Sequence, residues 1–194
     1  SQWIPRFSLG IVVAIATPGT LANETKLSSP FAKSGDYFGN SVSIAGDFAV
    51  VGAWQDDPQG AASGAAYVYA RDNAGTASDP SDDTWVFRVQ LLPSGGQPGD
   101  QFGISVSTDG THIAVGAWKA KGLHPGGGCT YVYRRDDNAT PADPMDDTWY
   151  QTAKLWADDA YIGVNFGYAV AIRSSTLGIG AYNDGFYQGA AYIF

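Results

Sequence analysis

The stretch Tyr37-Phe38-Gly39-Asn40-Ser41-Val42-Ser43 occurs three times along the chain. Its second copy is Gln101-Phe102-Gly103-Ile104-Ser105-Val106-Ser107, and its third is Asn165-Phe166-Gly167-Tyr168-Ala169-Val170-Ala171. Successive copies are 64 residues apart, measured between their phenylalanines. A fixed period of this length is typical of propellers and solenoids, in which each repeat is one small structural unit.

Other landmarks keep the same period. A tetrapeptide ending in an aromatic residue recurs as Val51-Gly52-Ala53-Trp54, Val115-Gly116-Ala117-Trp118 and Ile179-Gly180-Ala181-Tyr182. A glycine-led segment occurs at 64–69, 128–133 and 189–194, and its last copy comes only 61 residues after the second. The third repeat has therefore lost three residues from a loop.

Each repeat has the pattern of four short strands. In the first repeat, apolar alternation predicts strands over 38–44, 48–54, 65–71 and 85–92, separated by turn sequences such as Ala45-Gly46-Asp47. No segment shows a helical period. We predict an all-β fold of three four-stranded antiparallel propeller-type blades, at about 31–94, 95–158 and 159–194, the last together with the strand in 20–30.

The strand in 20–30 aligns with the fourth strand of the repeats, because Leu27 aligns with Leu91 and Leu155. The third repeat, in contrast, reaches only its third strand at Phe194. Propellers typically close with four to eight blades, so three are too few for a ring. We expect the N-terminal strand of another copy to complete the last blade, giving a closed oligomer or a filament. A fragment of a longer propeller is the alternative.

Residues 1–19 precede the repeats and contain an apolar run at 9–16 that is too short to span a bilayer as a helix. We predict a β-strand here that packs on a partner surface, either in the same chain or in another copy, where it would strengthen the joint between copies. The residues expected at this joint are Leu9, Ile11, Val13, Ile15, Leu27, Tyr192 and Phe194.

Composition narrows the class of protein. With 44% hydrophobic and 15% charged residues among 194, the chain is a packed protein. A net charge of -8 and a pI near 4.4 argue against nucleic-acid partners and anionic membrane surfaces. The single cysteine, Cys129, forms no disulfide within the chain and is expected to be a small buried strand residue.

These landmarks resemble the FG-GAP repeat, named for a Phe-Gly near its start and a later Gly-Ala-Pro. The resemblance covers about 20–194 and implies β-propeller blades, as in the head of integrin α chains, and an extracellular location. Trp54, Trp118 and Tyr182 take the place of the family's proline. The loops between the first two strands of each repeat are too poor in oxygen ligands for the calcium site of some members.

Two kinds of side chain are candidates for ligand sites. Acidic loops precede two strand tryptophans and offer carboxylates to a cation such as Ca²⁺, although solvated turns are the favoured interpretation: Asp79, Asp82, Asp83, Asp143, Asp146 and Asp147. The repeated aromatics Trp54, Trp118 and Tyr182 are candidate sugar-stacking platforms, with core packing the favoured alternative. Asn23 and Asn138 fit the N-glycosylation pattern.

The sequence shows no catalytic constellation, phosphate loop or zinc spacing. We therefore predict a non-enzymatic, secreted or cell-surface structural and adhesive protein, without a cofactor, whose partners are other copies of itself. A carbohydrate-binding propeller lectin is the alternative, as is a fragment of a larger FG-GAP adhesion protein.

Overall fold

The computed structural model describes residues 11–12, 24–31, 33–76, 81–159 and 161–194, and it shows three antiparallel sheets that follow the repeats. Blade one holds β3 (Ser41–Ala45), β4 (Phe48–Ala53), β5 (Ala65–Asp72) and β6 (Thr84–Leu91). Blade two holds β7 (Phe102–Thr108), β8 (His112–Ala117), β9 (Cys129–Asp136) and β10 (Thr148–Leu155). Blade three holds β11 (Phe166–Arg173), β12 (Thr176–Ala181) and β13 (Ala190–Ile193). The prediction of an all-β fold with propeller-type blades is confirmed.

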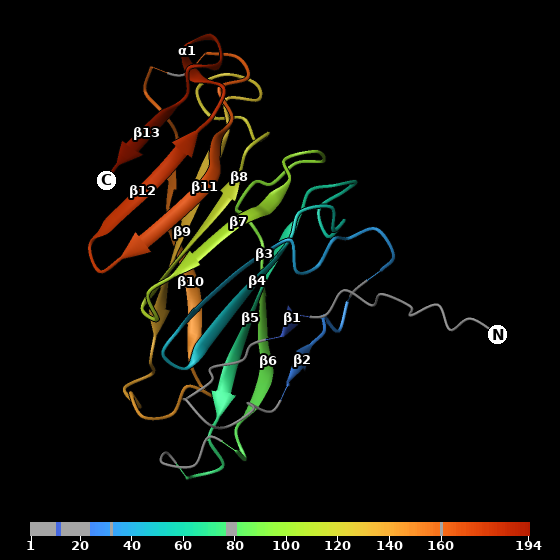
Figure 1. Ribbon diagram of the computed structural model, residues 1–194, viewed down its shortest axis with the longest axis vertical. Helices are drawn as coiled ribbons and strands as arrows, with labels where there is room; N and C mark the ends of the chain where they lie inside the picture. Colours follow the sequence, from blue (N-terminus) through green and yellow to red (C-terminus); the bar gives the residue numbers. More distant parts are fainter. Residues whose placement is uncertain (1–10, 13–23, 32, 77–80, 160) are drawn as a thin grey trace, which may run out of the picture.

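The blades stack side by side in chain order and do not close into a ring (Figure 1). Two isolated parallel bridges, Gly64 to Phe102 and Gly128 to Phe166, link successive blades. A short pair of strands, β1 (Ile11–Val12) and β2 (Lys26–Leu27), lies beside blade one, whereas β13 lies on the opposite side of the stack (Figure 1).

Two of the three core clusters lie between blades, and the other lies on the outer face of blade one, because each strand has alternating faces. On β4, Phe48 and Val50 face blade two and join one core cluster. Ala49 and Val51, on the other face of the same strand, join a separate cluster that includes Leu27. A third cluster fills the junction between blades two and three and contains Phe166 and Ile179. Each blade is therefore stabilised mainly by burial against its neighbours.

One helix departs from the sequence prediction. The four-residue α1 (Asp184–Tyr187) lies between β12 and β13, in the loop that is three residues shorter than its two counterparts. Cys129 is a free, fully buried residue on β9, as predicted, and burial raises the pKa of its thiol to about 11.

Candidate functional site: the open face of the third blade

Glycines bring successive blades into close backbone contact. A Cβ on Gly52 of blade one would lie 2.0 Å from the carbonyl oxygen of Gly103 in blade two. A Cβ on Gly116 of blade two would likewise lie 1.8 Å from the carbonyl oxygen of Gly167 in blade three. Since neither distance leaves room for a methyl group, glycine is required at both junctions. The Phe-Gly segment of each following blade is the part that makes this contact.

Hydrogen bonds hold that Phe-Gly segment in place. The amide of Phe102 donates to the carbonyl of Ser63 at 3.0 Å, and the amide of Phe166 donates to the carbonyl of Gly127 at 2.9 Å. The hydroxyl of Ser41 donates to the carbonyl of Gly103 at 2.9 Å. Ser105 makes the same bond to the carbonyl of Gly167 at 2.8 Å. The two internal junctions are thus built alike.

The matching face of blade three has no blade upon it in the described part of the chain. Gly180 corresponds to Gly52 and Gly116, and a Cβ there would meet nothing closer than Ala169, at 3.4 Å. A Cβ on Gly189, which corresponds to Gly64 and Gly128, would likewise have its nearest contact at 3.4 Å, to the carbonyl oxygen of Tyr182 in the same blade. The result is an open, apolar pocket of about 390 Å³ whose lining includes Tyr168, Ala169, Gly180, Tyr182, Gly189 and Ala190.

At the other end of the stack, residues 24–31 dock on blade one as the end of β6 docks on blade two. The Tyr69 hydroxyl donates to the carbonyl of Ser28 at 2.9 Å, and the Tyr133 hydroxyl donates to the carbonyl of Leu92 at 2.7 Å. Leu27 is as buried as Leu91, each being 3% exposed. Segment 24–31 therefore has the position of a fourth strand belonging to a blade that would precede blade one.

The remaining residues expected at a joint between copies differ in where they lie: some pair or pack within the chain, and others are outside the described residues. Ile11 pairs with Leu27 within the same chain, and Leu9, Val13 and Ile15 lie outside the described residues. Tyr192 packs against the core between blades two and three. Its ring centroid lies 5.3 Å from that of Phe166 in the same blade, and Phe194 lies 6.2 Å from the same ring. Burial, together with the Asp184 and Asp159 carboxylates that accept its hydroxyl proton, raises the pKa of Tyr192.

The sequence analysis did not identify Ile193 as a candidate. Its side chain lies on the face of β13 opposite to that of Tyr192 and is 72% exposed. Its counterparts Val68 and Val132 pack in the junctions between blades. The period-2 alternation of the last strand, compared with the two earlier repeats, was the signal that identifies it.

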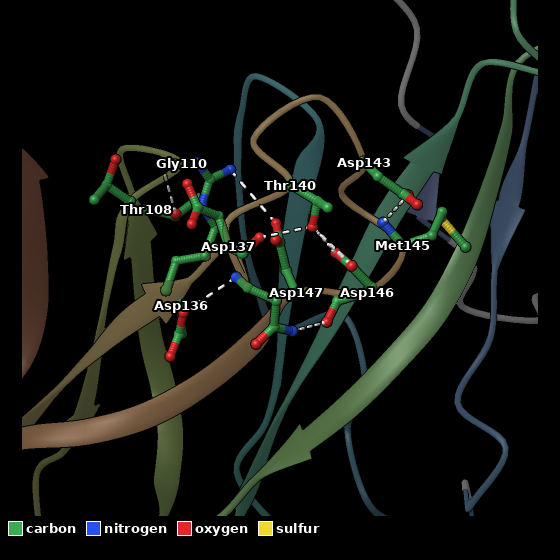
Figure 2. A network of polar contacts seen from close by, with 12 residues as sticks. Thr108, Gly110, Asp136, Asp137, Thr140, Asp143, Met145, Asp146 and Asp147 are labelled. Atoms are coloured by element: carbon green, nitrogen blue, oxygen red, sulfur yellow. Dashed lines mark hydrogen bonds and ion pairs between the residues drawn. The ribbon is translucent and has the colours of Figure 1, made fainter.

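In the acidic loop of blade two, Asp143 and Asp146 accept hydrogen bonds from the loop, whereas the buried carboxylate of Asp147 accepts none from the described residues (Figure 2). Both carboxylate oxygens of Asp146 accept from the Thr140 hydroxyl, and Asp143 accepts from the amide of Met145. Asp147 lies 3.5 Å from the Arg135 guanidinium. Burial raises the pKa of Asp147, an effect that Arg135 opposes and the nearby aspartates reinforce.

Blade one repeats this arrangement. Asp82 accepts from Thr76, and Asp83 pairs with Arg71 at 3.0 Å, while Asp79 lies outside the described residues. No group of three or more His, Cys, Asp or Glu side chains is placed to hold a metal ion within the residues that the structure describes. The hydrogen bonds agree with the interpretation as turns, and Ca²⁺ binding stays a prediction.

The repeated aromatics separate into two groups. Trp54 stacks on Tyr37, with ring centroids 5.3 Å apart. Trp118 lies 5.4 Å from Tyr168 and 6.1 Å from Tyr182, and its indole donates to Gln101. Tyr168 and Tyr182 also line the open pocket of blade three. Sequence reasoning did not identify Tyr37 and Tyr168 as partners, and sugar stacking stays a prediction.

The two glycosylation candidates differ in what the structure says of them. Asn138 is exposed in the acidic loop, where its side-chain amide donates to the carbonyl of Asp146. Asn23 lies outside the described residues. Glycosylation at both remains a prediction.

Fold and junctions together define a propeller-type repeat protein whose blades are joined by Phe-Gly contacts. The family model for the FG-GAP repeat matches residues 22–69, 85–133 and 149–194, which make up more than half of the chain. The chain belongs to the FG-GAP repeat family. A search of curated proteins finds no match.

FG-GAP repeats are typical of extracellular, adhesion-type proteins, and the family is generally non-enzymatic. Within the described residues, no helix has the length and apolarity needed to cross a membrane. The family's repeat is offset from the blade by one strand. The second matched repeat begins in β6, the fourth strand of blade one, and the third begins in β10, the fourth strand of blade two. The family's unit therefore includes the fourth strand of the preceding blade, which is the position that 24–31 has ahead of blade one.

Proposed function

We propose that this protein is a non-enzymatic, extracellular structural and adhesive protein that assembles with copies of itself by strand exchange. In this assembly, segment 24–31 of one copy becomes the fourth strand of blade three in the next copy. The observation that carries the proposal is the docking of Leu27 and Ser28 on blade one, which repeats that of Leu91 and Leu92 on blade two.

The edge of β13 has the hydrogen-bonding groups for such a strand. Leu177 and Phe194 exchange both of their backbone hydrogen bonds, so alternation directs the amides of Ala191 and Ile193 away from β12. Ala191 corresponds to Ala66 in blade one and to Thr130 in blade two. Those two residues pair with Leu91 and Leu155 of the fourth strand of their blade. Addition of a strand would satisfy this unpaired edge and remove an aggregation hazard.

A proline at the edge tests this proposal. Ala191→Pro removes an outward amide and leaves the hydrogen bonds to β12 in place. Ala191→Thr is the matched control, because blade two has Thr130 at this position. We expect sedimentation and electron microscopy to show oligomers or filaments for the wild type and Ala191→Thr, and monomers for Ala191→Pro. A wild type that stays monomeric at every concentration would contradict the proposal.

A further inference from the structure

We propose that the open pocket of blade three is a socket for the Phe38–Gly39 segment of a second copy. Copies would then join head to tail by the same contact that joins blades within one chain. This inference rests on the proposed self-assembly, and it adds a second contact surface to the strand exchange at β13.

The internal junctions show what such a socket holds. The face of blade one around Gly52 and Gly64 holds Phe102–Gly103, and the face of blade two around Gly116 and Gly128 holds Phe166–Gly167. Blade three has glycines at both of these positions, Gly180 and Gly189. The positive φ of Gly189 favours glycine there, but at Gly180 neither a positive φ nor a close neighbour in the described residues does so. An unfilled face with these glycines fits the backbone of another Phe-Gly segment.

Blade one offers that segment at the opposite side of the stack (Figure 1). No described residue accepts a hydrogen bond from the amide of Phe38, whereas Phe102 and Phe166 both donate to the preceding blade. The neighbouring strand is also uncovered: Val42 is 47% exposed, while its counterpart Val106 is 8% exposed. The two open faces are therefore the two halves of one kind of junction, and a second copy supplies the missing half.

Two alanines make the socket weaker than the internal junctions. Ser41 and Ser105, which donate to the incoming glycine carbonyl, correspond to Ala169 in blade three. The hydroxyls of Ser43 and Ser107, which accept amides of the next blade at 3.0 Å, correspond to Ala171. A joint without these hydrogen bonds relies on apolar contact and on the strand at β13, which favours an association that is reversible.

The test adds a methyl group to the socket. In a docked pair, Gly180→Ala would place its Cβ about 2 Å from a carbonyl oxygen, as the internal junctions show, but in the single chain its nearest contact is 3.4 Å. Gly178→Ala on the same strand is the control, since its nearest contact is 3.6 Å and blade two has Ala114 there. Ala169→Ser restores the missing donor.

We expect sedimentation equilibrium to show that Gly180→Ala is a folded monomer and that Gly178→Ala assembles like the wild type. Ala169→Ser should lower the dissociation constant about two- to tenfold, the effect of one added hydrogen bond. If Gly180→Ala assembles normally while Ala191→Pro does not, the socket is refuted and strand exchange stands. If the wild type does not assemble at all, both proposals fail.

Discussion

The close contact between blades predicts a large cost for one methyl group at Gly116. In Gly116→Ala the new Cβ would lie 1.8 Å from the Gly167 oxygen and 2.3 Å from the Ser105 hydroxyl. An ordinary contact of 3.4 Å requires blade three to move back by about 1.6 Å. That movement breaks the hydrogen bond from Ser105 to Gly167, which is 2.8 Å long. Overpacking together with the lost hydrogen bond costs about 2–4 kcal/mol of unfolding free energy.

Gly178→Ala is the control for this stability measurement as well, because its new Cβ would lie 3.6 Å from the nearest atom. Neither glycine has a positive φ, so backbone conformation does not separate the two substitutions. Urea unfolding, followed by tryptophan fluorescence at a concentration where the chain is monomeric, gives both free energies. Values for the two variants within about 0.5 kcal/mol of each other would refute the argument from blade contact.

Two further predictions concern titratable groups. Burial alone would raise the pKa of Asp109, but the amides of His112 and Thr111 and the His112 ring lower it below 3.8. Asp109→Ala should therefore cost about 1–2 kcal/mol at pH 7, and this cost should shrink as the pH falls below 3.8 and through the lower pKa of the folded carboxylate. Urea titrations at pH 7 and pH 3 measure both values, and Asp109→Asn, which keeps an oxygen acceptor, is the control. Because burial raises the pKa of Cys129 to about 11, its thiol should not react with a thiol reagent at pH 8 until urea unfolds the chain. Rapid labelling of the native protein would show that the β9 core is open.

Much of the fold follows from the sequence because one rigid contact is repeated. The Phe-Gly segments and the glycines opposite them recur at 64 residues, and the structure brings Phe102–Gly103 and Phe166–Gly167 onto those glycines. Periodicity also identified the spare strand around Leu27. It did not identify α1, because the loss of three residues removes the correspondence in that loop. The exposure of Ile193 follows from the alignment of the last strand with the two earlier repeats together with the absence of a described blade on its outer face, and the second of these is visible only in the structure.

The same comparison shows how the open face of the third blade differs from the two filled faces in the described part of the chain. A glycine at positions 52, 116 and 180 permits close approach in every blade, but only the first two blades have serines at positions 41 and 105 to bind the incoming carbonyl. Blade three has Ala169 there. A hydrogen bond adds about 0.5–1.5 kcal/mol to such a contact, and the loss of two bonds weakens a joint without changing its shape. A copy held on the face of blade three would therefore be bound less tightly than a blade is held at an internal junction.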